Sequence, residues 1–302
     1  MSGFEEIKMT ISNVIGTSMI AAGLQVSICM NAHADLRADW NIPQQPFQVY
    51  GNTYYVGTHG LSSILITSPK GHVLIDGTLP EAVPQIVANI KSLGFRIEDV
   101  KLILNSHVHF DHAGGIADLQ KLSGAKVAAS SASAPVLRSG EVSNDDPQFG
   151  GLPKITAVAN VSIVKEGETL KVATLALTAH LTPGHTPGGT SWSWRSCEQK
   201  HCINVVYADS LNPISAENYR YTDATRNPNG VQQLEKSHDV LSSLPCDVLL
   251  VPHPELADLF GKLELRKKDA AINPFIDASA CKRYVELSRE KLKARIATEQ
   301  SK

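Results

Sequence analysis

The sequence predicts an α/β protein, an αββα sandwich in which two mixed β-sheets are flanked by helices. Two observations predict this architecture. Strand-like apolar runs alternate with segments of helical periodicity in both halves of the chain, and no Pro/Gly/Ser-rich linker divides residues 40–302. With 42% apolar residues among 302, the chain can bury a substantial core. We therefore expect one domain over residues 35–302.

The first half contains the clearest elements. Apolar and β-branched runs predict strands at 47–58, 61–68, 71–76, 100–104 and 126–130. Residues 80–93 have Val83, Ile86 and Ile90 at helical spacing, and Gly94 ends this helix. Another helix is expected from Gly114 to about Leu122.

The second half repeats the pattern more loosely. Strands are predicted at 161–164, 169–180, 191–194, 203–207 and 247–251, and helices at 230–244 and 279–299. Polar residues follow directly on several of the predicted strands, where a rigid scaffold presents chemically active side chains. We expect these strand ends to form the functional site.

The N-terminus predicts an export signal. Residues 11–30 are mostly apolar or small, and Ala32-His33-Ala34 offers a cleavage site after Ala34, so residues 1–34 would be removed. The flank before the apolar run is acidic, whereas signal peptides begin with basic residues. A translation start at Met9 would remove that flank. The alternative interpretation of the run is a membrane-anchoring helix. We expect a periplasmic protein of a Gram-negative bacterium that is not attached to the membrane after cleavage.

Four cysteines remain after that cleavage, which suits two disulfides in an oxidising compartment and allows three pairings. Cys197 and Cys202 flank a short polar insertion that reads as a hairpin tip, so we favour their local pairing. Cys246 would then pair with Cys281. A zinc knuckle is disfavoured because the cysteines lack close paired spacing.

The overall charge argues against nucleic acid as a partner. The formal net charge is −2, and no run of Lys and Arg is longer than three residues. We expect a small-molecule substrate and, since nothing in the sequence requires an oligomer, a monomer.

Five short stretches together predict a metal centre. The first, Asn105–His112, contains the pattern His-x-His-x-Asp-His, with four possible ligands in six residues. The others are Asp76-Gly77, Thr182-Pro-Gly-His185, Ala208-Asp209-Ser210 and Val251-Pro-His253. Imidazoles with one carboxylate suit Zn²⁺, and six ligands exceed what one tetrahedral ion needs. The count therefore indicates two Zn²⁺ ions.

These ordered motifs resemble those of the metallo-β-lactamase superfamily, and their wording is similar to subclass B3. The resemblance covers about residues 40–295 and implies the αββα fold with two zinc sites at one edge. It implies that His107, His109 and His185 hold the first zinc, and that Asp111, His112 and His253 hold the second. Subclass B1 has a cysteine at the second site, whereas Ser210 follows Asp209 here.

The resemblance also implies the chemistry. A zinc-bound hydroxide would hydrolyse the β-lactam amide bond of penicillins, cephalosporins and carbapenems, and so confer antibiotic resistance. Asp111 would orient this hydroxide as the catalytic residue. Ser210 would bind the substrate carboxylate, and Asn212 stands where the family often has a hydroxyl residue. Gln148, in the polar loop 139–152, would orient water or substrate.

Two residues keep alternative interpretations. In glyoxalase- and lactonase-like relatives an aspartate at the position of Asp209 bridges the metals, whereas B3 enzymes hold zinc without it. Direct ligation by Asp209 would favour the alternative function, that of a lactonase or thioester hydrolase. A metal-binding protein without turnover is the alternative from another class. Asp76 would either support the metal loop or cap the turn at Gly77.

Overall fold

The first β-sheet is made by residues 47–164, so it takes in the strand 161–164 that opens the second half of the chain. A computed structural model describes residues 36–301. Its strands β1–β7 lie side by side in chain order, antiparallel from β1 to β4 and parallel from β4 to β7. Their bounds are Phe47–Tyr50, Thr53–Tyr55, Ile64–Ile66, His72–Ile75, Val100–Leu104, Lys126–Ser130 and Val161–Val164.

The second sheet is made by the second half, in the order β12-β11-β10-β9-β8. Its strands are β8 Thr169–Val172, β9 Leu175–Leu181, β10 Thr190–Glu198, β11 His201–Tyr207 and β12 Val248–Leu250. Strands β11 and β12 are parallel and the other neighbours are antiparallel. Both sheets are thus mixed, as the sequence predicts.

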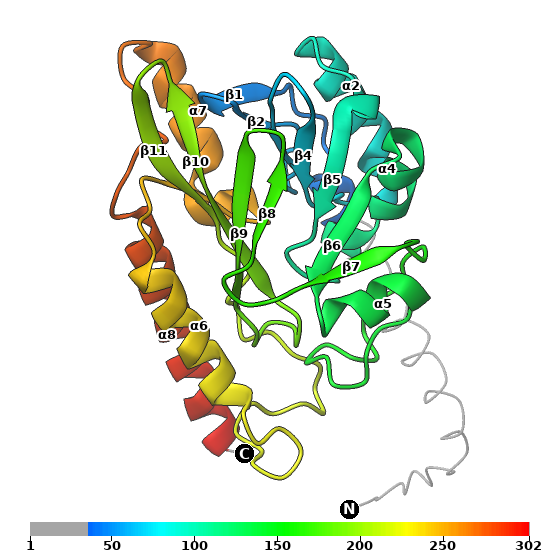
Figure 1. The fold of residues 1–302 in the computed structure, drawn as a ribbon. Helices are drawn as coiled ribbons and strands as arrows, with labels where there is room; N and C mark the ends of the chain where they lie inside the picture. Colours follow the sequence, from blue (N-terminus) through cyan, green and yellow to red (C-terminus); the bar gives the residue numbers. More distant parts are fainter. Residues whose placement is uncertain (1–35, 302) are drawn as a thin grey trace, which may run out of the picture. The chain divides into compact units, whose positions relative to one another are not determined.

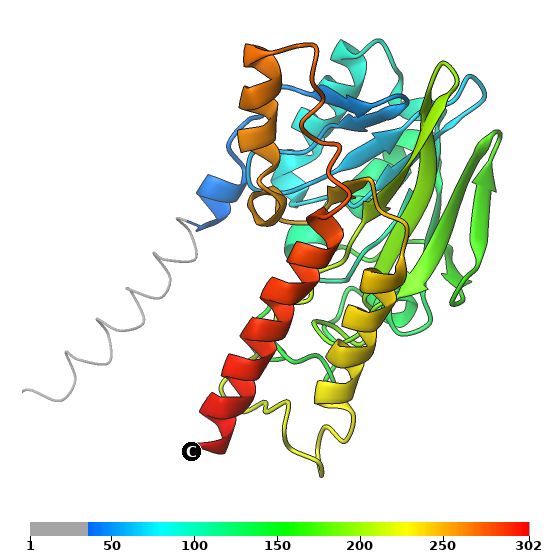
Figure 2. The same cartoon turned by 90° about the vertical axis from the view of Figure 1, so that its left-hand side faces the viewer.

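Within residues 41–301, helices cover both outer faces of the two-sheet sandwich (Figures 1 and 2). On the first sheet lie α2 Val83–Ser92, α4 Ile116–Ser123 and α5 Ser133–Ser139, with the single turn α3 Phe110–Ala113 beside them. On the second sheet lie α6 Gly230–Ser243 and α8 Ala280–Gln300, which pack together. Short 3₁₀ helices occupy Pro80–Ala82, Ile97–Asp99 and Pro254–Ala257 (η1 to η3), and α7 spans Leu259–Lys268. Residues 36–40, which belong to a separate unit, are helical.

The main core lies between the two sheets. It contains Trp192 and Trp194 from β10, Tyr55 from β2 and Ile75 from β4, all at least nine-tenths buried. A further hydrophobic cluster lies between each sheet and the helices that cover it. Trp192 and Trp194 are two residues apart, so both face the same side of their strand. The sandwich is therefore filled from both inner faces.

Some predicted elements differ from the observed ones. The runs 47–58 and 169–180 are each divided by a tight turn, at which Gly51 and Ala173 have φ of +51°. The helices α5 and α7 were missed, because Pro135 and Gly261 stand inside short segments that look like loops. In α8, Leu287 is 54% exposed, whereas Tyr284 and Leu292 are buried. No helix among residues 36–301 is long and apolar enough to cross a membrane.

The structure confirms both predicted disulfides. Cys197–Cys202 closes the β10–β11 hairpin, and Cys246–Cys281 joins the segment before β12 to the first turn of α8. The predicted signal segment, residues 1–34, lies outside the described residues.

We predict that the two disulfides contribute unequally to stability. The sequence separations are 35 and 5 residues, so loop closure predicts a loss of about 4 kcal/mol for removing Cys246–Cys281 and about 2 kcal/mol for removing Cys197–Cys202. Urea unfolding of the Cys246→Ala/Cys281→Ala and Cys197→Ala/Cys202→Ala proteins measures both. A larger loss from the hairpin pair would contradict the prediction.

Candidate metal centre

The motif residues lie on loops that follow strand ends. Asp76 follows β4, His107 follows β5, His185 follows β9, Asp209 follows β11 and His253 follows β12. Because β4 is parallel to β5 and β11 is parallel to β12, the loops after each pair leave from one edge of their sheet (Figure 1). Backbone contacts join the two sheets there, since Thr190 N donates to Ser106 O at 2.8 Å.

Asp76 fixes the loop that carries the first histidines. Its carboxylate is fully buried and accepts hydrogen bonds from the backbone and hydroxyl of Ser106, at 2.8 and 2.6 Å, and from Tyr207 Oη at 2.8 Å. Asn105 Nδ2 lies 3.3 Å away and also donates to the His107 carbonyl. These contacts favour support of the metal loop over a simple turn cap.

The first group of possible ligands comprises His107, His109 and His185. One nitrogen from each lies within 4.8 Å of the other two, and the three side chains are buried. The other nitrogens have partners: His107 Nδ1 lies 2.7 Å from Asp209 Oδ1, and His185 Nδ1 donates to the Asn212 carbonyl at 2.8 Å. These contacts orient the imidazoles of His107 and His185.

The second group comprises Asp111, His112 and His253. Asp111 Oδ2 lies 3.1 Å from His112 Nε2 and 3.4 Å from His253 Nε2. The loop before β3 borders this group, because Ser62 N donates to Pro252 O at 2.8 Å. The ring centroids of His107 and His112 are 4.3 Å apart, so the two groups adjoin.

The electrostatics suit a cation. Burial lowers the pKa of His107 well below its ordinary value, and burial together with His109 lowers the pKa of His185 to about 3. Burial alone would raise the pKa of Asp111, but His112 and His253 hold it well below its ordinary value. Neutral imidazoles and an ionised carboxylate are the forms that bind metal.

A buried nitrogen without a protein partner also indicates that these residues can hold a metal ion. His107 Nε2 is buried without a hydrogen-bond partner among the described residues, although its Nδ1 is engaged by Asp209. A buried imidazole nitrogen left in this way is unfavourable unless something else takes its lone pair. Imidazole nitrogens grouped with a carboxylate are zinc ligands, so the two groups can hold metal.

Asp209 belongs to neither group. It is fully buried, and burial raises the pKa of its carboxyl well above the ordinary value. Its Oδ1 faces His107 Nδ1, whereas its Oδ2 approaches Gly189, where an added Cβ would come within 2.4 Å. This geometry places Asp209 behind the His107 imidazole.

The three predicted substrate contacts lie on two loops. Ser210 is buried directly after Asp209, and the Asn212 carbonyl holds His185. The Asn212 side-chain oxygen accepts a hydrogen bond from Lys291 Nζ at 2.8 Å, a contact that the sequence did not indicate. Gln148 lies half-buried on the other loop, and its backbone N–H donates to Asp146 Oδ1 at 2.8 Å.

One face of α8 holds the segment 209–222. Residues three or four positions apart on a helix share a face, and five such residues contact this segment. Four of them donate hydrogen bonds: Tyr284 to Asp209 O, Ser288 to Leu211 O, Lys291 to Asn212 Oδ1 and Arg295 to Tyr219 O. The fifth, Glu299, accepts hydrogen bonds from the N–H groups of Tyr221 and Thr222. We call these five residues the α8 ladder.

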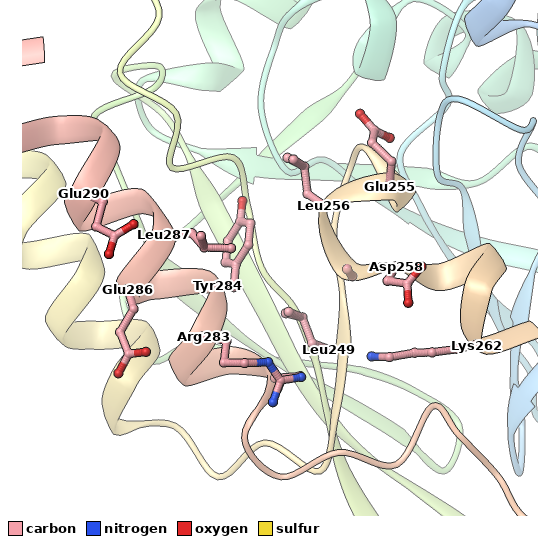
Figure 3. A pocket seen from close by; sticks show the side chains of 12 residues that line it. Leu249, Glu255, Leu256, Asp258, Lys262, Arg283, Tyr284, Glu286, Leu287 and Glu290 are labelled. Atoms are coloured by element: carbon pink, nitrogen blue, oxygen red, sulfur yellow. The ribbon is translucent and has the colours of Figure 1, made fainter. Parts of the chain in front are cut away.

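A separate pocket lies away from the metal ligands. Figure 3 shows it between α8, η3 and α7, with a volume of about 480 Å³. Its wall contains Glu255, Lys262, Arg283 and Glu286 above an apolar floor, but none of the six predicted ligands. Glu255 Oε1 lies 3.9 Å from Nδ1 of the predicted ligand His253.

Sequence reasoning missed Asp146. This residue is buried, and its carboxylate oxygens lie 3.1 and 3.3 Å from His109 Nε2. The only signal available was its place in a polar loop, beside Asp145 and before Pro147. No motif spacing distinguishes Asp146 from Asp145, although Asp145 is exposed.

Comparison with known proteins agrees with this geometry. Residues 56–198 match the family model of the metallo-β-lactamase superfamily. Hydroxyacylglutathione hydrolases of Bradyrhizobium sp. (strain ORS 278) and Methylobacterium nodulans are 30% and 32% identical over 123 and 122 residues. These matches cover 40% of this chain and only 38% of each relative.

Solved structures match over far more of the chain. The Rm3 metallo-β-lactamase is 51% identical with a TM-score of 0.84, over 86% of this chain and 97% of that one. MEM-A1, a subclass B3 enzyme isolated from a soil metagenome library, is 50% identical with a TM-score of 0.84, over 87% and 99%. SMB-1 is 44% identical with a TM-score of 0.83, over 86% and 99%. The protein therefore belongs to the metallo-β-lactamase superfamily and, within it, to the subclass B3 metallo-β-lactamases.

Proposed function

We propose that this protein is a zinc β-lactamase that opens penicillins, cephalosporins and carbapenems and so confers antibiotic resistance. The observation that carries the proposal is the pair of adjoining ligand groups at one sheet edge, His107/His109/His185 and Asp111/His112/His253. We assign one Zn²⁺ ion to each group. The extensive similarity to Rm3 and MEM-A1 supports this activity.

Bound zinc supplies a Lewis acid that brings the pKa of water toward neutrality and polarises an amide carbonyl. Asp111 directs Oδ2 toward His112 and His253, so its Oδ1 can accept a hydrogen bond from the attacking water. Water oxygen adds to the lactam carbonyl carbon, the C–N bond breaks, and the nitrogen takes a proton. No nucleophile from the protein is needed.

The substrate carboxylate is assigned to Ser210, with Asn212 and Gln148 at the border of the cleft. SMB-1 has been solved with 2-mercaptoethanesulfonate and with mercaptoacetic acid, each of which combines a thiol with an anionic group. Thiolate is a good zinc ligand, so such compounds support an anion-binding position beside a zinc centre. A hydroxyl such as that of Ser210 can donate to such an anion.

The position of Asp209 disfavours a lactonase or thioester hydrolase with an aspartate bridging two metals. Its Oδ1 is directed at His107 Nδ1, and it is a member of neither ligand group.

We further propose that residues 1–34 are an export signal, that residues 35–302 act as a single-domain monomer, and that the enzyme works in the periplasm. The two disulfides support an oxidising compartment.

We predict that chelation abolishes β-lactam opening and that Zn²⁺ restores it. The mature protein is assayed with a penicillin, a cephalosporin and a carbapenem before chelation, after it, and after titration with Zn²⁺. Activity should return fully at two equivalents of Zn²⁺. Unchanged activity in protein shown to be metal-free would exclude the mechanism, and zinc-loaded protein that opens no lactam would favour another hydrolase.

We predict that Asp111→Ala lowers kcat by about 100-fold or more while the fold persists, because the change removes both a ligand and the acceptor for the attacking water. Asp118→Ala is the matched control, since Asp118 is an exposed carboxylate on α4. Circular dichroism establishes folding. Normal turnover in folded Asp111→Ala protein would rule out the assigned role.

We predict that Ser210→Ala raises KM about tenfold for substrates that carry a free carboxylate, because a hydrogen bond to a charged group is lost. The control is chemical: the same β-lactam with its carboxylate esterified should show no effect of the substitution. An equal effect on the acid and the ester would assign Ser210 a structural role instead.

A further inference from the structure

Asp146 contacts the predicted zinc ligand His109 although it is not itself one of the six predicted ligands. The residue is 3% exposed, in the loop between α5 and β7. A buried carboxylate is unfavourable unless it receives hydrogen bonds. It receives them from the His109 imidazole, with Nε2 3.1 Å from Oδ2, and from Gln148 N at 2.8 Å from Oδ1.

This contact decides which nitrogen of His109 is available. A carboxylate accepts, so Nε2 carries the proton and donates to Asp146, which leaves the lone pair on Nδ1. His107 and His185 are arranged in the opposite way, with Nδ1 engaged and Nε2 left for a metal ion. Each imidazole of the first group therefore has one nitrogen occupied by a protein partner.

The same carboxylate links the metal group to the loop that bears Gln148. The residue after it, Pro147, accepts a hydrogen bond from Ala216 N at 2.8 Å, which ties this loop to the segment held by the α8 ladder. Asp146 thus lies where the two loops that border the metal groups meet. Its loss would release both the imidazole of His109 and the backbone of Gln148.

We propose that Asp146 is a positioning residue that holds His109 as the Nε2–H tautomer, with Nδ1 toward the first metal ion, and that fixes the Gln148 loop beside it. A carboxylate behind a ligating imidazole orients the ring and increases its basicity, and removal of such a partner typically costs about 10- to 100-fold in metal affinity. The inference rests on the proposed zinc centre but not on the identity of the substrate.

The test measures Zn²⁺ binding by competition with a chromophoric chelator in the full protein. Asp146→Ala should weaken the binding of the ion in the first group by about 10- to 100-fold. One of the two Zn²⁺ dissociation constants should therefore rise by this factor. Asp146→Asn should weaken it less, because the amide oxygen still accepts a hydrogen bond but carries no charge. Asp145→Ala, which removes an adjacent exposed carboxylate, is the matched control and should bind both ions as the unaltered protein does.

A second measurement separates positioning from loss of structure. In the metal-free protein, ¹⁵N NMR of the imidazoles should show His109 with its proton on Nε2, and Asp146→Ala should shift this toward a mixture of tautomers. Wild-type affinity for both ions in Asp146→Ala protein that melts normally would overturn the proposal. If Asp146→Ala does not fold, unaltered zinc affinity in Asp146→Asn would overturn it, because the amide lacks the negative charge of the carboxylate. Absence of lactam opening by zinc-loaded unaltered protein would count against the proposed substrate alone.

Discussion

The metal centre depends on one buried anion, the carboxylate of Asp76. Burial raises the pKa of Asp76, and an unpaired carboxylate in this interior would be strongly unfavourable. Donors from Ser106, Asn105 and Tyr207 offset that cost, and they come from the loop after β5 and from β11. Because these donors belong to both sheets, the sandwich must be assembled before the first histidines can take their places.

Around this anchor, each histidine of the first group is held from behind by a different oxygen: a carboxylate of Asp209, a backbone carbonyl of Asn212, and a carboxylate of Asp146. The oxygens come from two separate loops, the one after β11 and the one between α5 and β7. A ligand group built in this way is ordered before any metal arrives, so that binding does not have to fix side-chain rotamers. It is also sensitive to changes in residues that never touch the metal.

The sequence was most informative where several possible metal ligands occur within a few residues. His107, His109, Asp111 and His112 lie within six residues, and their spacing predicts a metal loop without any knowledge of packing. The strand and helix order followed from periodicity, and both disulfides were predicted. The turns that divide 47–58 and 169–180, and the helix α7, were not, since each depends on a local backbone choice that tertiary packing decides. Asp146 could not be separated from Asp145, because burial alone distinguishes them.

The α8 ladder has a consequence for the order in which the site is made. The six predicted ligands lie between residues 107 and 253, whereas the ladder begins at Tyr284 and ends at Glu299. A ribosome therefore delivers every ligand before it delivers the helix that holds segment 209–222. That segment includes the carbonyl behind His185. Early in synthesis the ligands are present but one wall of their loop is unsupported, and the site acquires its final shape only when α8 has docked.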